Sequence, residues 1–411
     1  MKNLLVVGNG FDLAHGLPTK YGDFLDYMTL YITKHEKNWE HWGINPWGEK
    51  INYWKYYNYV LRDVSANLKK NSNVNELFDK TAEQFKDMLQ KYTLEKFYEN
   101  TFVRYCLYVY SYKQTFDIEF NWIDIEKELL NFLTEIHSKN PDANSLSSLY
   151  LQLSRREFDK LTTIQFYIPT VISILRSNNI PPEFFRKAVF DHLFKELEEF
   201  NLLLKVYLKL VKNSFNDIQK VFKIKHNDDQ YGFAVEPYEG IKIDNILSFN
   251  YTDTAKIYDP EAEIYFINGT LQSERIILGV ENPNLEETNK YCNEDAHLFF
   301  KNVQRVLYDF SYDYKYLLNQ NVEKNVYIMG HSLAISDKYI LKDLMTNYGK
   351  ITTNRSSVSR VIIYYYNDKD KRDKIANLYQ LLGDELFSQL TNNPVGKPYI
   401  SLINQDELTI K

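Results

Sequence analysis

The feature that most constrains the fold is a set of short, continuous apolar runs near both ends of the chain. The first run covers residues 3–8 and ends in a glycine. Comparable runs return much later in the chain, at residues 245–250, 263–269, 275–280, 325–331 and 360–367. Several of these runs also end in Gly or Asn. Such runs are typical of strands that are buried on both faces of a parallel sheet. The sequence therefore predicts an α/β fold with a mostly parallel sheet.

The residues between the first run and the later ones have a helical pattern instead. In residues 123–136 and 185–211, apolar side chains recur every three or four positions. We therefore expect residues 1–22 and 236–411 to form one α/β nucleotide-binding domain. Residues 23–235 are expected to form a mainly helical insertion that follows the first strand and helix.

Composition narrows the class of protein. The net charge of −6 disfavours a protein that coats nucleic acid, because phosphate contacts need clustered Lys and Arg. The two cysteines, Cys106 and Cys292, fit a reducing compartment and exclude both a disulfide framework and a cysteine-rich zinc site. No apolar stretch has the length of a signal peptide core or a membrane span. We expect a cytoplasmic protein without a membrane segment.

The first strand runs into the segment GNGFDLAHGLP, residues 8–18. A strand followed by glycines and a helix gathers backbone N–H groups at one point and favours anions there. The full dinucleotide fingerprint is absent because residue 13 is leucine, and a P-loop is absent as well. Asp12 then has two interpretations. It can be a helix N-cap, which contributes about 0.5–2 kcal/mol, or it can belong to a ligand site.

Polar residues also follow three of the later runs, at the edge where α/β sheets gather their ligand sites. Each group has a simpler explanation: Thr252 can cap a helix, and Asn268 with Gly269 can form a turn. Because four strand ends of one predicted sheet carry such residues, we favour a shared crevice. The later strand ends contribute Asn250, Thr252, Asp253, Asn268, Gly269, Gly330, His331, Ser332 and Asp337.

Taken in order, these motifs resemble those of the bacteriophage abortive infection AbiH family. The matching segments are residues 8–21, then Trp122, Asp124 and Glu126, and then residues 249–253, 276–279 and 330–337. Asn268 is the main departure, since we expect the family's histidine at this position. The resemblance spans nearly the whole chain and implies an antiphage protein that acts by abortive infection.

A more distant similarity connects the first motif to sirtuin-type NAD-binding domains. Their G-x-G-I-S-x-x-x-G-I-P spacing is kept here, with Asp12 in place of the serine. The similarity implies a Rossmann-like, sirtuin-like sheet that binds NAD or a related nucleotide as substrate or ligand. The zinc module of sirtuins is missing, and no metal is expected. Beyond the later strand ends above, the residues expected to contact the nucleotide are Gly8, Asn9, Gly10, Phe11, Gly16 and Pro18.

Hydrolysis of NAD passes through an oxocarbenium-like state, as glycoside hydrolysis does. In this interpretation Asp12 lies beside the ribose, and Asn250 orients the ribose or a water. His331 exchanges protons near neutral pH or only hydrogen-bonds a loop. Asn268 cannot act as a base. If the sirtuin-like base belongs at this position, the protein is slow, inactive as an NAD hydrolase, or dependent on His331 or His15 instead.

Glu126 is the fourth candidate catalytic residue. On a helix it shares a face with Trp122, Leu129 and Leu133, and a carboxylate on an apolar face is costly unless it is paired. It forms a salt bridge with a buried Lys or Arg, or it extends its carboxylate to solvent at the edge of the apolar face, or it lines the crevice and does acid/base chemistry.

Three functions stay open at this point. The first is hydrolysis of NAD or a related nucleotide. The second is a nucleotide-binding sensor whose helical insertion contacts a phage or host protein. The third is a metal-dependent nuclease in which Asp12, Asp124 and Glu126 bind Mg²⁺. Nucleic acid is not an expected partner in the first two, and self-association is left open.

Overall fold

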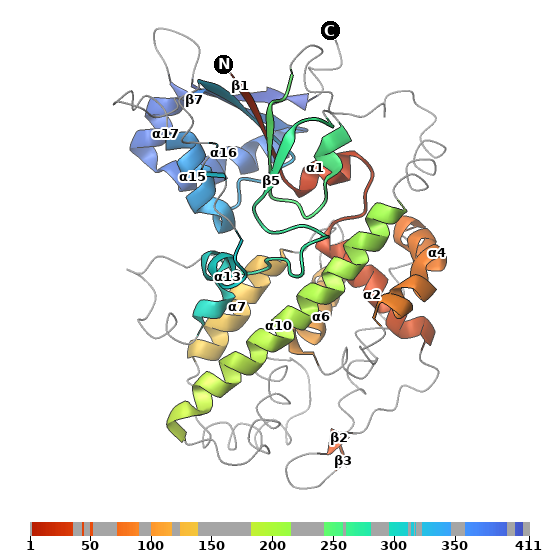
Figure 1. The fold of residues 1–411 in the computed structure, drawn as a ribbon. Coiled ribbons are helices and arrows are strands. Elements are labelled where there is room, and N and C mark those ends of the chain that lie inside the picture. The colour runs from red at the N-terminus through yellow and green to blue at the C-terminus, as the bar shows by residue number, and fades with distance from the viewer. Residues whose placement is uncertain are drawn as a thin grey trace. The chain divides into compact units, whose positions relative to one another are not determined.

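The computed structural model describes residues 2–35, 43–44, 50–51, 72–89, 100–116, 124–138, 182–214, 242–257, 260–280, 296–310, 314–315, 317, 323–346, 358–392 and 399–405. The chain divides into two compact units. The sheet unit consists of Met1–Thr19, Val211–Ile277 and Arg305–Lys411. The helical unit consists of Lys20–Leu210 and Leu278–Gln304. Figure 1 shows the elements of both units. Trp122 and Cys292 lie outside the described residues.

The sheet unit is built on six parallel strands in the order β5-β4-β1-β6-β7-β8. Numbered along the chain, this is the 3-2-1-4-5-6 order of doubly wound dinucleotide-binding sheets. The order reverses between β1 and β6. The predicted α/β fold with a parallel, Rossmann-like sheet is thereby confirmed. The strands are β1 (Lys2–Val7), β4 (Asn245–Ser248), β5 (Glu263–Phe266), β6 (Lys324–Met329), β7 (Val358–Tyr365) and β8 (Ile400–Asn404).

The two faces of the sheet carry different elements. Leu4 and Val6 of β1 point to the face that packs against α15 (Lys338–Thr346), α16 (Asp368–Leu382) and α17 (Asp384–Thr391). Leu5 and Val7 point to the other face and pack near Phe11 of α1 (Asn9–Ala14). Alternate side chains of one strand thus bury both faces, which is why the first run is continuously apolar. Two 3₁₀ turns, η2 (Thr254–Ile257) and η4 (Ile335–Asp337), follow β4 and β6.

The helical unit has an aromatic core. Tyr27 and Tyr207 are fully buried with ring centroids 5.2 Å apart, and Phe78 and Phe85 pack on Tyr27. The helices that supply this core and its surroundings are α2 (Tyr21–His35), α4 (Ser72–Met88), α6 (Thr101–Phe116), α7 (Ile125–Ser138) and α10 (Pro182–Asn213). The smaller elements are β2 (Gly43–Ile44), β3 (Lys50–Ile51), η3 (His297–Phe299) and α13 (Lys301–Leu307), the last of which begins in this unit.

Most of the sequence-based elements are confirmed, with two differences. The run at 275–280 is wrong as a strand of the sheet. Residues 276–280 are buried, yet the run pairs only through an isolated bridge between Val280 and Phe300. The sequence prediction also missed β8, whose residues are only half buried beyond Ile400. The expected helices at 123–136 and 185–211 are α7 and α10.

The domain boundaries expected from the sequence stay a prediction. The compact units assign Leu278–Gln304 to the helices and Val211–Ile277 to the sheet. Within the described ranges, none of the helices has the length and apolar character needed to cross a bilayer.

Candidate functional site

Asp12 is the most deeply buried acidic group at the carboxyl edge of the sheet. Its side chain is 1% exposed, and its Oδ2 accepts a hydrogen bond of 2.6 Å from the Thr252 hydroxyl. Thr252 in turn accepts from the Thr254 hydroxyl at 3.1 Å. Oδ1 of Asp12 is buried and has no hydrogen-bond partner among the residues that the structure describes. A carboxyl oxygen is therefore held in place while the other is left unsatisfied, which is costly in a folded protein.

The surroundings of Asp12 change its acidity. Burial removes water from the carboxylate and raises its pKa to about 6, while the hydrogen bond from Thr252 and the nearby polar side chains of Thr254 and Asn250 partly oppose that rise. The N-cap interpretation of Asp12 is wrong. The cap position of α1 is Gly8, which makes no side-chain cap bond, and Asp12 lies inside the helix.

The glycines of the first turn allow two backbone segments to touch. The Gly10 amide donates to the Gly330 carbonyl at 2.8 Å, and the Gly8 amide donates to the Met329 carbonyl at 3.2 Å. A Cβ on Gly330 would lie 2.0 Å from the Phe11 nitrogen, and one on Gly10 would lie 2.8 Å from the Gly330 oxygen. The turn after β1 therefore packs directly on the turn after β6, at the point where the strand order reverses.

This contact uses the N–H groups that the sequence suggested for binding an anion. The amides of Gly8, Gly10 and Phe11 all donate to carbonyl groups of the protein. Contacts of Gly8, Gly10 and Phe11 with a nucleotide stay a prediction, and phosphate groups bound at this edge need other donors.

The rest of the first motif closes its own loop. Asn9 donates from Nδ2 to the Thr19 carbonyl at 3.2 Å and accepts from the Thr19 hydroxyl at 2.7 Å. Gly16 has a φ of +80°, a conformation that favours glycine, and Pro18 lies in the closed segment. The spacing from Asn9 to Thr19 thus has a structural role, whatever ligand the motif contacts.

Asn250 and Asn268 connect neighbouring strand ends. Asn250 donates from Nδ2 to the Gly8 carbonyl at 3.0 Å, which joins the end of β4 to the first turn. Asn268 donates to the Phe249 carbonyl at 3.1 Å and accepts from Nη2 of Arg305 at 3.2 Å. Gly269 follows with a φ of +83°. Both ends of the Asn268 amide are thus in use, at the position where the resemblance suggested a histidine base.

His331 lies after β6 in a buried polar arrangement. Its Nδ1 accepts a hydrogen bond from the Leu333 amide at 2.9 Å, so the neutral ring carries its proton on Nε2. Nε2 lies 3.5 Å from Oδ2 of Asp337, and the ring contacts Phe249 edge-on with centroids 4.4 Å apart. Asp337 therefore faces His331, which follows the same strand. Ser332 is exposed, and its carbonyl accepts from Asn377.

Two other sequence candidates have partners of their own. Asp253 forms an ion pair with Lys212, 2.6 Å apart, at a partly exposed position. His15 donates from Nδ1 to the Phe11 carbonyl at 2.7 Å, and burial lowers the pKa of its ring. His15 therefore stabilises the end of α1 through this hydrogen bond.

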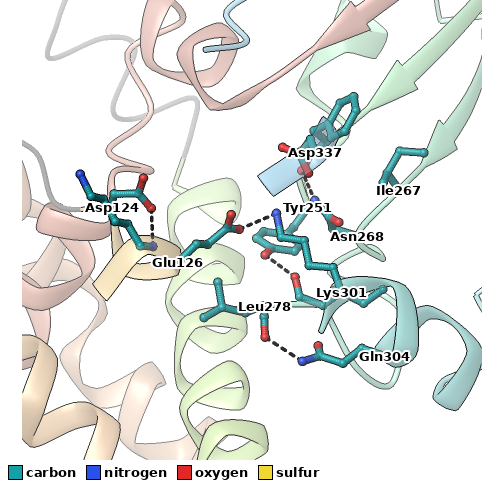
Figure 2. Close-up of polar contacts among 12 residues, drawn as sticks. Asp124, Glu126, Tyr251, Ile267, Asn268, Leu278, Lys301, Gln304 and Asp337 are labelled. Atoms are coloured by element: carbon teal, nitrogen blue, oxygen red, sulfur yellow. Dashed lines mark hydrogen bonds and ion pairs between the residues drawn. The ribbon is translucent and has the colours of Figure 1, made fainter. Parts of the chain in front are cut away.

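Glu126 lies in the helical unit and forms a buried ion pair. Its carboxylate is 2.8 Å from Nζ of Lys301, whose side chain is 1% exposed, as Figure 2 shows. The salt-bridge interpretation of Glu126 is confirmed, and its catalytic role stays a prediction. Asp124 caps α7 by accepting from the Lys127 amide at 3.0 Å. Across the described ranges, no group of three His, Cys, Asp or Glu side chains is arranged to hold a metal ion.

Sequence analysis missed several residues of this arrangement. Thr254 belongs to the Asp12 cluster. A second threonine two residues after Thr252 is a sequence feature that could have identified it. Thr19 follows Pro18 in the first motif. Arg305 and Lys301 lie on the short helix α13, where nothing in the local sequence identifies them.

The comparison with protein families decides the family. The family described as "Bacteriophage abortive infection AbiH" matches residues 4–364, which include every residue of the Asp12 and His331 groups. The chain belongs to the AbiH family. Membership of AbiH supports an antiphage role through abortive infection. No match is found among curated proteins or among solved structures.

We expect Gly330→Ala to destabilise this AbiH protein by about 3 kcal/mol or more. The added Cβ meets the backbone at 2.0 Å and also adopts a φ of +63°. Gly383 has a φ of +76° but open space around it, so Gly383→Ala is the matched control, with a cost of about 1–2 kcal/mol. Urea unfolding measures both, and equal midpoints for the two variants would contradict the close contact.

A second prediction concerns the ion pair of the helical unit. Lys301→Met removes the ammonium group 2.8 Å from the Glu126 carboxylate and is expected to cost about 3–5 kcal/mol of unfolding free energy. Adding Glu126→Gln removes the charge that faced it, so the double variant should be more stable than the sum of the single changes. Thermal unfolding of the three variants measures this coupling. Additive losses would show that the pair is not coupled.

Proposed function

We propose that this AbiH protein binds NAD or a related nucleotide at the carboxyl edge of its sheet and hydrolyses the N-glycosidic bond. The observation that carries the proposal is the state of Asp12: a buried carboxyl group with one oxygen held by Thr252 and the other without a partner in the described residues. Structural carboxylates are normally satisfied on both oxygens, whereas perturbed carboxyl groups gather at functional sites.

The position of Asp12 supports the same proposal. In a doubly wound sheet, ligands bind outside the carboxyl ends of the strands, next to the point where the strand order reverses. Here that point lies between β1 and β6, and Asp12 and His331 follow these two strands directly. The sirtuin-like spacing of the first motif favours an NAD-type nucleotide over other ligands.

The proposed chemistry uses Asp12 as a general base and as a negative charge. The bond between nicotinamide and ribose breaks, and nicotinamide leaves with the bonding electron pair as a neutral ring. The ribose cation that forms is stabilised by the Asp12 carboxylate. A water oxygen bonds to the ribose carbon, and the water proton passes to Asp12 and then to solvent. The products are nicotinamide and ADP-ribose.

The second polar arrangement has a supporting role in this proposal. His331 presents an Nε2 proton toward Asp337, and its Nδ1 is fixed by the Leu333 amide. A ring that is fixed through Nδ1 keeps the direction of its Nε2 proton, which a ligand hydroxyl or a water between His331 and Asp337 could accept. Asn250 donates to the Gly8 carbonyl and so fixes the turn that leads to Asp12 against the end of β4.

The test is release of nicotinamide from NAD by the purified protein, with extract of infected cells supplied as a source of the trigger. Because burial raises the pKa of Asp12 to about 6, the base is protonated and inactive at low pH. The rate should rise with pH through a midpoint near 6 and level off above 7. Asp12→Asn should abolish turnover at every pH, and Asn250→Ala should reduce it.

The stability of Asp12→Asn separates loss of chemistry from loss of folding. The pKa of Asp12 is higher in the folded chain than in the unfolded one, so folding favours the protonated form. The carboxylate therefore costs stability above pH 6, and that cost is absent below the unfolded value near 3.8. The amide should be more stable than wild type at pH 8, by roughly 1–3 kcal/mol. Absence of both NAD binding and turnover would overturn the proposal.

A specific observation also favours a second function, a sensor that binds the nucleotide without hydrolysing it. Asn268 stands where the resemblance suggests a base, and both ends of its amide are occupied. In this case a phage or host protein that contacts the helices would be the partner. NAD would then bind without nicotinamide release, and Asn268→His would be the variant to examine for gained hydrolysis.

A further inference from the structure

We propose that Arg305 binds the phosphate groups of the ligand and that Asn268 positions its guanidinium group. The inference rests on the proposed nucleotide-binding function and names the residue that recognises the anionic part of the ligand. It concerns binding alone, so it can hold even where hydrolysis does not occur.

The geometry of Arg305 fixes one part of the guanidinium group and leaves another part available. Nε donates to the Ile267 carbonyl at 3.3 Å, and Nη2 donates to Oδ1 of Asn268 at 3.2 Å. The residue is 8% exposed, and Nη1 is neither fully buried nor hydrogen-bonded to any described residue. A planar guanidinium group whose Nε and Nη2 are held by the protein, and whose Nη1 is available as a donor, is well suited to bind a phosphate.

The charge of Arg305 has no counter-ion within the part of the chain that the structure describes. Its two acceptors are a backbone carbonyl and a side-chain amide, both neutral. A buried charge without an opposite charge is costly, and the cost is offset when a bound anion supplies the missing charge. By contrast, Lys301 on the same helix is paired with Glu126.

Asn268 explains why the charge stays available. Its amide oxygen orients the guanidinium group without neutralising it, and its Nδ2 is anchored on the Phe249 carbonyl. A carboxylate at this position would form an ion pair and compete with a bound anion. A neutral histidine has a single acceptor nitrogen and one N–H, with a different geometry. The amide is therefore the side chain that fits a positioning role.

The position of Arg305 agrees with a phosphate site at the ligand edge. Asn268 lies just after β5, and the carbonyl that it contacts belongs to Phe249, just after β4. Thr252, which contacts Asp12, lies three residues further along the chain, and three residues span at most about 10 Å. The Gly10 amide is already used by Gly330, so a positive side chain supplies what the glycine turn lacks.

The experiment is calorimetric titration of the full-length chain with pyrophosphate, ADP-ribose and, as an uncharged probe, adenosine. Arg305→Met should weaken binding of pyrophosphate and ADP-ribose by about 10- to 100-fold, as expected for loss of a charge-assisted hydrogen bond. Arg305→Lys should be intermediate, and adenosine binding should not change. Arg372→Met, which removes an exposed arginine of α16, is the matched control and should bind as wild type does.

Asn268→Asp tests the positioning role, because it keeps an oxygen for Arg305 while adding a competing charge. It should weaken pyrophosphate binding at temperatures well below its unfolding transition. Because the variant also loses the Nδ2 donor to the Phe249 carbonyl, thermal unfolding is measured beside it. A merely structural role would lower the unfolding temperature without weakening pyrophosphate binding by the folded protein. Wild-type affinity for pyrophosphate in Arg305→Lys and Asn268→Asp, or no pyrophosphate binding by wild type, would overturn the inference. If pyrophosphate binding depends on Arg305 but NAD is never hydrolysed, the hydrolytic function fails and the inference stands.

Discussion

The hydrogen bond between Thr252 and Asp12 is the interaction on which the rest of the candidate site depends. It joins the first helix of the chain to the end of β4, 240 residues later, inside a buried polar cluster. Because the cluster is shielded from water, the carboxyl group becomes a weaker acid, and the Thr254–Thr252 chain of hydroxyl groups fixes only one of its oxygens. The fold thereby keeps a carboxyl group that can take up a proton near neutral pH at the edge where doubly wound sheets bind ligands.

This arrangement requires that the turns after β1 and β6 approach each other closely. Gly10 and Gly330 allow that approach, since a side chain on either would collide with the opposite backbone. The same contact sets the position of His331, which directly follows Gly330. It also engages the Gly10 amide in a hydrogen bond with the Gly330 carbonyl. In this AbiH protein the Gly10 amide is therefore not available to bind a diphosphate, as it would be in a phosphate-binding glycine turn. We therefore assign phosphate recognition to Arg305, with Asn268 as the residue that positions it.

Much of the sheet could be predicted from the sequence, because residues 4–7 and 326–329 are buried on both faces and are continuously apolar. The run at 275–280 has the same composition but does not join the sheet, since burial alone does not specify pairing. Strand β8 was missed because its half-buried residues mix polar and apolar types. The contact between Asn268 and Arg305, 37 residues apart, and the pairing of Glu126 with Lys301 depend on tertiary structure and have no local pattern.

The altered acidity of the buried Asp12 carboxyl group can be measured directly, by carboxyl ¹³C NMR titration of protein labelled at aspartate. The Asp12 resonance can be assigned as the one missing from Asp12→Asn. We expect a titration midpoint at a pH of about 6. Thr252→Val removes the hydrogen bond that lowers the pKa of Asp12, so the midpoint should move upward in this variant. A midpoint near the ordinary value of 3.8, unchanged in Thr252→Val, would show that burial does not alter the acidity of Asp12.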